Sequence, residues 1–592
     1  MTSRPAEQGS NPPPLKRWVF GTAAFLLPLV LLLLVEFALS AAGVAEDRRK
    51  VFIPVNESGS HLALNPAYVE RYFSDFRPGV PFTPFAHEKA DSTYRVVTLG
   101  GSTTAGFPYR FYNGFPGRLG VLLQAAMPDR HVEVVNLSMS AVTSYTVLDL
   151  GRAVLSHDPD VFVVYAGHNE FYGAFGVATT ESALANLPWL KRLILRLRKT
   201  VLFTLAEGLF QDDRRQPGPS DRTLMARVVR EADIPEGGEV FRAGIEQYRQ
   251  NMSRLLHAAR EAGVPVVLGT LVDNLSGQAP LSGGPHADSL FAVGQALLGN
   301  GEVDAARDAF SRARDADGLR FRAPGALNQW IVSQTEATVV DLRPVFDAAS
   351  ATGIPGYDLF TDHLHPSARG YGLMAEAFAR SVAPEPRIAL EPDFGLDDLD
   401  RSHADLLLAR LLGDYPFVRN PDPDSVLANQ RAPVVAALRR GGIDSLAAMI
   451  VTGRTQFQTA QSEATALLLA AGDSLSALRS ARSLVSWQPL NRELVFRWLR
   501  TGLENPALDH ETLRLAVLAA SRWPDAFSLG GLGVVLLRQG RLDEAEWALG
   551  QAEAISPEDP SVLFNTARLL VLSGDTLSAQ QYFARYQAVV QN

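Results

Sequence analysis

A serine that directly follows an apolar run is the first sign of chemistry in this sequence. Residues 94–99, "YRVVTL", lead into Gly100, Gly101 and Ser102. This arrangement is typical of a tight turn, and it equally fits a nucleophile held at the end of a buried strand. A serine hydroxyl is a weak nucleophile unless a neighbouring base takes its proton. The function of Ser102 therefore depends on whether the chain supplies such a base.

The segment "DHLHP", residues 362–366, contains a candidate base. His365 could accept the serine proton, and Asp362 could hold the imidazole in the correct tautomer. Pro366 disfavours a helical conformation for His365 and suits the first position of a helix that we expect at residues 366–382. This spacing predicts a histidine fixed at the junction between a loop and a helix.

Two further segments could stabilise the oxyanion that forms when a serine attacks a carbonyl carbon. Such an oxyanion requires preorganised hydrogen-bond donors. The segments are "NLSMSAVTS", residues 136–144, and "GHNE", residues 167–170. The candidate donors are the backbone N–H groups of Ser102 and Ala141 and the side-chain amide of Asn169. Because residue 141 is an alanine, we expect an ordinary, negative φ there.

The sequence pattern places these segments at the ends of predicted strands. β-Branched runs occur at residues 94–99, 131–136, 160–167, 264–272 and 337–342. Helical patterns lie between them, for example at residues 115–127, 143–156 and 239–262. Strands that alternate with helices predict a parallel sheet covered on both faces. In such sheets the active site lies beyond the carboxyl ends of the strands, where these polar segments are expected.

Together the four segments resemble the motif blocks of the SGNH (GDSL-type) hydrolases over residues 93–383. The resemblance implies a flavodoxin-like three-layer α/β/α fold and the cleavage of esters and related acyl groups. It implies that Ser102 is the nucleophile, with Gly101 where the family has an aspartate. It also implies that Ala141 stands where a family glycine donates its backbone N–H to the oxyanion.

The two later blocks of the resemblance are closer to the family pattern. Asn169 matches the asparagine whose side chain donates to the oxyanion, and Glu170 replaces the aspartate that follows it. Asp362 and His365 match the last block without change. The resemblance therefore implies a catalytic set of Ser102, Asp362 and His365, with an oxyanion hole made by Ser102, Ala141 and Asn169.

A metal site is the alternative interpretation of the same histidines. His168, His363 and His365 with Asp362 could together bind a metal ion. This interpretation is less economical, because it leaves Ser102 unexplained and lacks a compact ligand motif. We therefore predict neither a metal ion nor another cofactor.

A long apolar segment near the N-terminus predicts membrane attachment. After a polar tail at residues 1–17, the apolar stretch runs through residues 18–45, interrupted only by Glu36. About 20 apolar residues suffice to cross a bilayer as a helix. The alternative is a cleaved signal peptide, since "ALSA" offers small residues, but signal peptides have apolar cores of only about 7–15 residues. We expect a transmembrane anchor.

The basic residues that flank the anchor do not settle its orientation. Arg4, Lys16 and Arg17 precede it, and Arg48, Arg49 and Lys50 follow it. Long C-terminal domains are translocated largely regardless of such charges, so we expect the bulk of the chain outside the cytoplasm. Residues 46–92 are mixed polar and aromatic, with several prolines, and we expect a loosely packed stalk there.

Two insertions interrupt the predicted catalytic domain, at residues 174–235 and 286–323. In the first, residues 187–205 predict a helix with an apolar face of Leu190, Leu193, Ile194, Leu197 and Val201. Its remaining surface carries Lys191, Arg192, Arg196, Arg198 and Lys199. Three interpretations remain open: a surface helix docked on the core, a basic amphipathic helix on the membrane, or a lid beside the active site.

The C-terminal part of the chain contains a repeat. Gly540 and Gly574 lie 34 residues apart, as do Ala545 and Ala579, and the second insertion shows a similar pattern. This period is that of tetratricopeptide (TPR) repeats, which stack because no single hairpin buries its apolar face alone. Residues 395–592 therefore predict an all-α TPR-like solenoid that binds a protein partner or steadies the catalytic domain. Because this region contains none of the motif blocks, we do not expect catalysis to need its side chains.

Composition excludes some classes of function. The 592-residue chain has a formal net charge of −9, which is unfavourable for general nucleic-acid binding, and it has no cysteine for a thiol nucleophile. The sequence thus predicts a membrane-anchored serine esterase that acts on an acyl ester, such as one on a cell-surface glycan or lipid. The alternatives are an acyltransferase that modifies a surface polymer, and a non-catalytic assembly protein whose TPR-like region recruits partners.

Overall fold

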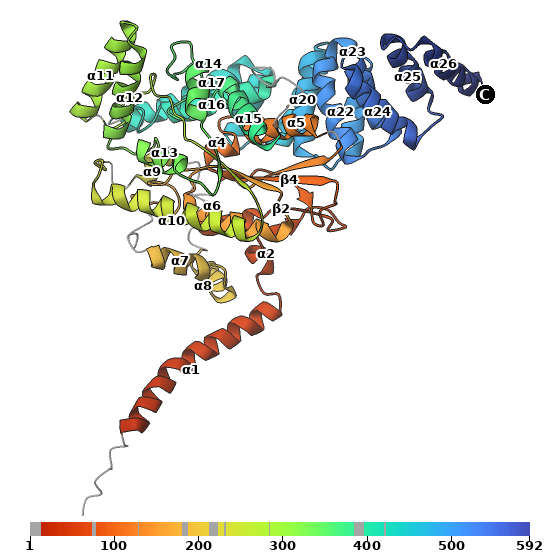
Figure 1. Cartoon of the computed structure of the whole chain (residues 1–592). Helices are drawn as coiled ribbons and strands as arrows, with labels where there is room; N and C mark the ends of the chain where they lie inside the picture. Colours follow the sequence, from red (N-terminus) through yellow and green to blue (C-terminus); the bar gives the residue numbers. More distant parts are fainter. Residues whose placement is uncertain are drawn as a thin grey trace, which may run out of the picture.

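A five-stranded parallel sheet forms the centre of the computed structural model (Figure 1). The structure describes residues 14–73, 78–127, 129–179, 188–211, 223–229, 233–282, 284–383, 396–419 and 422–591. The strands are β4 (Thr93–Gly100), β5 (His131–Asn136), β6 (Val161–Tyr165), β7 (Val266–Gly269) and β8 (Thr338–Val340), in the order β5-β4-β6-β7-β8. This is the flavodoxin-like order, and it confirms the predicted fold class.

Helices cover both faces of this sheet. On one side α5 (Phe115–Ala126) packs against α15 (Ala368–Val382), with α14 (Leu342–Ala349) beside α15. On the other side α6 (Ser144–Val154) packs against α10 (Glu239–Glu261), with α13 (Gly325–Val332) beside α10. Figure 1 shows α5 and α15 above the strands and α6 and α10 below them. The central strands are buried on both faces, which explains why their sequences are continuous apolar runs rather than alternating ones.

The segment between the N-terminal apolar helix and the sheet is folded onto the core, so the expectation of a loosely packed stalk at residues 46–92 is wrong. It forms an antiparallel sheet of β1 (Phe52–Pro54), β2 (His61–Leu64) and β3 (Phe85–Ala86). A short helix, α3 (Pro66–Val69), lies between β2 and β3 in the chain. Tyr68, Tyr72 and Phe85 are fully buried and belong to the same apolar core as the main sheet. These aromatic residues belong to the core, although the mixed composition of the segment suggested a linker.

A single long helix precedes this segment. Helix α1 (Pro14–Ala41) contains an apolar window, Ala24–Ala41, that is long enough to cross a membrane and is not buried by the rest of the protein. A four-residue helix, α2 (Glu46–Arg49), joins it to the globular part (Figure 1). The length and composition of α1 are those of an anchor or of a signal sequence.

The first insertion lies beside α1. It contains α7 (Pro188–Leu197), α8 (Val201–Gln211) and α9 (Leu224–Val228). Glu36, the acidic residue within the apolar stretch of α1, accepts hydrogen bonds from Val201 N at 2.7 Å and Leu202 N at 2.9 Å. A carboxylate at the N-terminus of a helix satisfies unpaired N–H groups and interacts favourably with the helix dipole. This contact joins the first insertion to α1.

The second insertion forms a helical hairpin of α11 (Pro285–Gly299) and α12 (Val303–Ala316). Ala306, Phe310 and Ala313 of α12 are buried. Gly294 of α11 faces Phe310, since a Cβ on this glycine would lie 2.7 Å from the phenyl ring. The spacing of small and aromatic residues in this insertion therefore reflects close packing between the two helices.

The C-terminal region is all-helical in the described residues 396–419 and 422–591. Its helices are α16 (Asp398–Leu412), α17 (Pro423–Arg440), α18 (Gly442–Val451), α19 (Phe457–Ala470), α20 (Ser474–Trp487), α21 (Arg492–Leu503), α22 (Asp509–Arg522), α23 (Ala526–Arg538), α24 (Leu542–Ile555), α25 (Pro560–Leu572) and α26 (Thr576–Gln591). The repeated glycines Gly540 and Gly574 have φ of 73° and 88° in the turns after α23 and α25. Ala545 and Ala579, five residues later, are buried in the helices that follow. The 34-residue spacing thus marks equivalent helix–turn–helix positions, and the assignment to TPR-like repeats stays a prediction.

The loop 107–114, which follows Ser102 in the chain, packs against the C-terminal helices. Tyr112 and Asn113 both donate hydrogen bonds to the carboxyl group of Asp400 in α16, at 3.2 Å and 2.6 Å. The guanidinium of Arg110 lies 3.5 Å from the ring centroid of Phe457 in α19, a cation–π contact. The C-terminal helices therefore hold the loop 107–114, which begins only five residues after Ser102.

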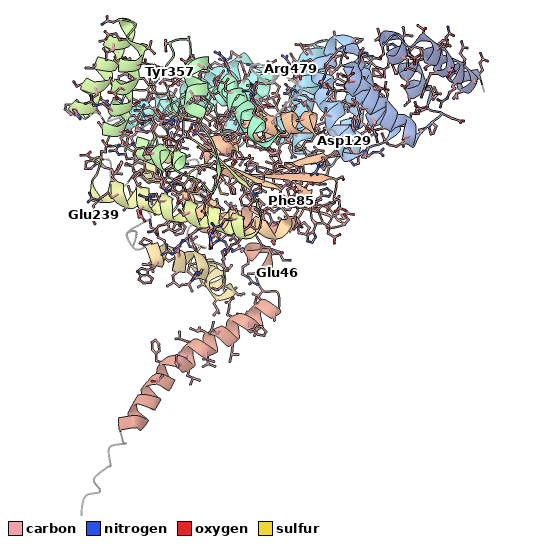
Figure 2. The ribbon with its side chains drawn as sticks, in the orientation of Figure 1. Glu46, Phe85, Asp129, Glu239, Tyr357 and Arg479 are labelled. Carbon is pink, nitrogen blue, oxygen red and sulfur yellow. The ribbon has the colours of Figure 1, made fainter. Side chains whose placement is uncertain are left out.

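A second contact between the two regions lies at the other end of α5. Trp547 of α24 donates its indole N–H to Asp129 at 2.7 Å. Figure 2 shows Asp129 at the border between the sheet domain and the C-terminal helices. The two regions therefore meet near both ends of α5, rather than at a single linker.

We predict that Asp400→Ala destabilises this interface. It leaves the buried Tyr112 hydroxyl and Asn113 amide without their acceptor, which typically costs about 2 kcal/mol. The midpoint of thermal unfolding should fall by roughly 2 °C when the whole chain unfolds as one unit, and by about 5 °C when the C-terminal helices unfold alone. The matched control is Asp398→Ala, because Asp398 is exposed on the same helix. Midpoints measured on the detergent-solubilised full chain should separate the two variants, and equal midpoints would contradict the assigned interface.

Candidate active site

Close contacts between loops explain why β4 ends in two glycines. A Cβ on Gly100 would collide with the carbonyl oxygen of Tyr165 in β6 and with the side chain of Thr104. The Thr104 hydroxyl donates to that same carbonyl at 2.9 Å. A Cβ on Gly101 would lie 2.8 Å from the amide nitrogen of Asn169. The absence of side chains here allows the β4 end, the β6 end and the Asn169 loop to converge.

The three residues of the predicted catalytic set lie in one hydrogen-bonded line. Ser102 begins a short helix, α4 (Ser102–Ala105), and its Oγ lies 2.7 Å from Nε2 of His365. Nδ1 of His365 lies 2.6 Å from Oδ2 of Asp362. Because an ionised carboxylate only accepts hydrogen bonds, Nδ1 carries the proton and Nε2 is free to accept the serine proton. This is the arrangement in which a serine, a histidine and an aspartate act as a catalytic triad.

Asp362 is fully buried and is held as an anion by its neighbours. Its other oxygen, Oδ1, accepts hydrogen bonds from the backbone N–H groups of Leu364 at 2.9 Å and His365 at 2.8 Å. Burial alone would raise the pKa of Asp362, but the imidazoles of His365 and His363 hold this pKa well below its usual range. A charged Asp362 keeps the His365 ring in one orientation and one tautomer.

Ala141 adopts a left-handed conformation, so the expectation of an ordinary φ at this position is wrong. Its φ is 57°. Its carbonyl accepts a hydrogen bond from Ala174 N at 2.8 Å, and Val142 forms a parallel bridge with Ala174. These contacts impose a backbone shape that a glycine would adopt without strain and that costs an alanine about 1–2 kcal/mol. The local backbone here is therefore glycine-like despite the alanine.

Glu170, next to Asn169, ties this loop to the underlying helix. It is fully buried and accepts hydrogen bonds from Ser144 N at 3.0 Å, Ser144 Oγ at 2.8 Å and Gln247 Nε2 at 2.7 Å. Burial raises the pKa of Glu170, although its hydrogen bonds oppose that rise. Glu170 therefore fixes the backbone that carries Asn169, which is half-buried beside Gly101.

The histidines of the alternative metal interpretation have other partners. Nδ1 of His168 accepts a hydrogen bond from Ala323 N at 3.2 Å, and Nε2 lies 3.2 Å from the Tyr165 hydroxyl. Burial and the nearby imidazoles of His363 and His365 lower the pKa of His168 to about 3. Asp362, His363 and His365 do lie close enough together to hold a metal ion. In that cluster, however, both Asp362 oxygens and both His365 nitrogens already have the hydrogen-bond partners described above.

Sequence reasoning missed two residues that shape the site. The ring of Phe107 lies against the imidazole of His365, with 4.5 Å between the ring centroids. The hydroxyl of Tyr371 in α15 donates to the Phe107 carbonyl at 2.6 Å. No pattern marks Phe107 as a site residue, because its role comes from the loop that the C-terminal helices hold.

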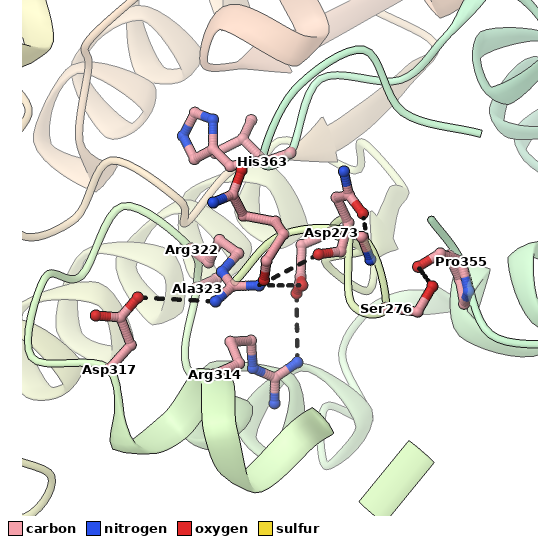
Figure 3. Close-up of polar contacts among 12 residues, drawn as sticks. Asp273, Ser276, Arg314, Asp317, Arg322, Ala323, Pro355 and His363 are labelled. Carbon is pink, nitrogen blue, oxygen red and sulfur yellow. Dashed lines mark hydrogen bonds and ion pairs between the residues drawn. The ribbon is translucent and has the colours of Figure 1, made fainter. Parts of the chain in front are cut away.

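A buried charged network lies behind the site (Figure 3). Arg322 donates to the carbonyl oxygens of Asn274 at 3.2 Å and Gln278 at 2.9 Å, and it lies 3.7 Å from Asp317. Arg314 of α12 donates to Asp273, after β7, at 3.3 Å. These contacts fix the second insertion to the carboxyl end of the sheet, close to His363.

Comparison with known proteins finds a family match over part of the sheet domain. Residues 98–243 match the model of the GDSL-like lipase/acylhydrolase family. The chain carries a GDSL-like acylhydrolase domain. The match includes Ser102, Ala141 and Asn169, and it ends before Asp362 and His365. A search of curated proteins finds no match.

Several solved structures are similar to parts of the chain. An acetylxylan esterase mutant from Geobacillus stearothermophilus is 16% identical, covers 49% of this chain and 95% of its own, and has a TM-score of 0.27. A GDSL-like lipase from Bacteroides thetaiotaomicron is 12% identical, with 50% and 91% covered and a TM-score of 0.25. MamA from Desulfovibrio magneticus is 18% identical, with 27% and 93% covered and a TM-score of 0.21.

We predict that Gly101→Ala impairs ester hydrolysis without unfolding the protein. The new methyl group would displace the Asn169 amide, and loss of one oxyanion donor typically lowers kcat by about 10²–10³-fold. The rate with p-nitrophenyl acetate measures this loss. Gly299→Ala is the control, because a Cβ at Gly299 meets no other atom within 4 Å.

The double variant Gly101→Ala/Asn169→Ala tests the physical reason for this loss. If the methyl group acts only by moving the Asn169 amide, the double variant is no slower than Asn169→Ala alone. Additive losses, or an unimpaired Gly101→Ala, would contradict this explanation.

Proposed function

We propose that this protein is a membrane-anchored serine ester hydrolase with Ser102, His365 and Asp362 as its catalytic triad. The observation that carries the proposal is the continuous hydrogen-bonded line from Ser102 Oγ through the His365 ring to Asp362. The match to the acylhydrolase family supports the same class of reaction.

In the proposed mechanism, Ser102 Oγ attacks the carbonyl carbon of an ester while Nε2 of His365 takes the hydroxyl proton. The resulting oxyanion is stabilised by the backbone N–H groups of Ser102 and Ala141 and by the Asn169 amide. His365 then gives the proton to the leaving alcohol, and an acyl-enzyme remains on Ser102. Water, deprotonated by His365, attacks the acyl-enzyme and releases the carboxylic acid and free Ser102.

The acceptor in the second half of this reaction distinguishes the main alternatives. If a sugar hydroxyl replaces water, the same residues make the protein an acyltransferase for a surface polymer. A further alternative is an assembly protein that binds a ligand without turnover and recruits partners through its C-terminal helices. The geometry from Ser102 to His365 favours turnover, because a base within hydrogen-bond reach activates the serine hydroxyl, which a site that only binds a ligand does not need.

We further propose that α1 anchors the protein in a membrane and that the globular part lies outside the cytoplasm. The length of α1 supports this, and so does its exposed apolar surface, with Phe25, Leu33 and Phe37 among the most exposed side chains. Glu36 is compatible with a membrane position because two backbone N–H groups of α8 bind its carboxylate.

We predict that Ser102→Ala lowers kcat for p-nitrophenyl acetate by roughly 10⁴-fold or more, because the nucleophile is lost. The midpoint of thermal unfolding should stay close to that of the wild type. Ser156→Ala, at an exposed serine, is the control and should keep full activity. Equal turnover by the Ser102→Ala variant would exclude Ser102 as the nucleophile.

We predict that residues 18–45 remain on the mature protein. Cell fractionation should find the protein in the membrane fraction, and N-terminal sequencing should find no cleavage within α1. A version in which a cleavable signal peptide replaces residues 1–45 should be soluble and serves as the control. A soluble mature form of the natural chain that begins near Ala41 would show that α1 is a signal peptide.

A further inference from the structure

A basic cavity lies between α6, α7 and α10, outside the candidate active site. Its volume is about 330 Å³, which falls in the range of small-ligand pockets. The charged residues that line it are Arg152, Arg192, Arg196, Lys199, Arg254 and Asp149. Five cationic groups therefore face one carboxylate.

That carboxylate is already neutralised. Asp149 pairs with Lys199 through Oδ1, and its Oδ2 accepts hydrogen bonds from the hydroxyl groups of Tyr68 and Tyr72, both at 2.7 Å. Within the parts of the chain that the structure describes, Arg152, Arg192, Arg196 and Arg254 have no carboxylate partner. The cavity thus carries an excess of guanidinium charge that the protein itself does not compensate.

The arginines are close enough to repel one another. Burial lowers the pKa of Arg254, and the neighbouring guanidinium groups of Arg192 and Arg152 lower it further. Nη1 of Arg192 is buried without a hydrogen-bond partner. A buried donor beside like charges is unfavourable unless an anion binds there. Guanidinium groups form paired hydrogen bonds with phosphate oxygens, which suits phosphate above a simple halide ion.

Buried contacts fix the position of α7 and thus of its arginines. Lys191, expected on the polar surface of this helix, is buried and donates to Phe175 O and to Gln247 Oε1, both at 2.7 Å. Burial lowers the pKa of Lys191 to about 8. With Lys191 facing inward, Leu193 and Leu197 are exposed and Arg192 and Arg196 line the cavity.

The cavity lies on the side of the domain that carries the N-terminal helix. Figure 1 shows α7 and α8 together below α6 and α10, on the same side as α1. Glu36 of α1 binds the start of α8, which follows α7 by three residues. Trp189, Leu193 and Leu197 on α7 are exposed, as expected for an apolar face at a membrane surface.

We propose that this cavity binds the phosphate group of an anionic lipid headgroup at the membrane surface. The uncompensated arginines bind the phosphate oxygens, and the exposed apolar side chains of α7 contact the acyl-chain region. The membrane position rests on the proposed anchoring through α1, whereas the phosphate chemistry rests only on the cavity. This site is separate from ester hydrolysis, because none of its charged lining residues belongs to the triad or the oxyanion donors.

Binding to the detergent-solubilised full chain tests the proposal. The probes are dioctanoyl phosphatidylglycerol, dioctanoyl phosphatidylcholine and inorganic phosphate, each measured by titration calorimetry. We expect phosphatidylglycerol to bind more tightly than phosphatidylcholine, whose choline cation meets the excess positive charge. Arg192→Gln/Arg254→Gln should weaken phosphatidylglycerol binding by about tenfold or more, since each basic residue near an anionic surface contributes substantially. Arg249→Gln, an exposed arginine elsewhere on α10, should not weaken it.

The outcomes distinguish a lipid phosphate from free phosphate, and they distinguish either of these from a cavity that binds no phosphate. If inorganic phosphate binds as tightly as phosphatidylglycerol and the double variant loses both, the cavity binds phosphate but the lipid assignment is overturned. If the double variant binds phosphatidylglycerol like the wild type, or if no probe binds, the phosphate site itself is overturned. Hydrolysis of p-nitrophenyl acetate should be unchanged in the double variant, so that failure here is distinguishable from failure of the proposed esterase function.

Discussion

The close approach of three loops at the end of β4 is the constraint on which the site depends. A Cβ at position 100 would collide with the Tyr165 carbonyl and the Thr104 side chain. A Cβ at position 101 would lie too close to the Asn169 amide. A side chain at position 100 would collide with the backbone of β6, so β4 could not keep its place beside that strand. A side chain at position 101 would displace the end of the Asn169 side chain, which is the group that we propose as an oxyanion donor.

The site is also joined to the C-terminal helices, although they contribute no residue to the triad. The loop that begins at Phe107 covers the His365 ring and then enters the interface through Arg110, Tyr112 and Asn113. A change in the packing of α16 would therefore reach the imidazole through a few covalently linked residues. The sequence suggested a division of labour between the two regions, but the structure makes the C-terminal helices part of the support for the site.

The features that sequence could predict are those with a strong local signal. Continuous apolar runs identify central strands that are buried on both faces, so β4, β6 and the strand ends that carry Ser102 and Asn169 could be predicted. The 34-residue spacing of Gly540 and Gly574 marks real turns, because a positive φ favours glycine. The placement of Asp362 beside His365 followed from their short separation in the chain.

The features that sequence could not predict depend on contacts between distant segments. The left-handed φ of Ala141 comes from its pairing with residue 174, and local propensity points the other way. The aromatic residues of segment 46–92 were indistinguishable from a linker, because their burial depends on the sheet that they cover. Lys191 looked like a surface charge, and only the tertiary fold shows that its ammonium group reaches Gln247.

The buried position of Lys191 also connects α7, which lies on the side of the N-terminal helix, to the candidate site. Lys191 donates a hydrogen bond to Gln247, and Gln247 donates one to Glu170. Glu170 directly follows Asn169 in the chain, and the loop after Glu170 packs on Ala141. Helix α7 thus has two faces with different roles, since one holds the backbone of a proposed oxyanion donor and the other presents arginines to the basic cavity. Because the start of α8 binds Glu36 of α1, the proposed anchor, the proposed phosphate cavity and the backbone around Asn169 are connected through α7 and α8. A displacement of α7 would have to break the buried hydrogen bonds that the Lys191 ammonium group donates to Phe175 O and Gln247 Oε1. Hydrogen bonds from a charged donor are stronger than those between neutral groups. The fold therefore favours a single arrangement of the candidate active site relative to α7 and α8, the helices that contact α1.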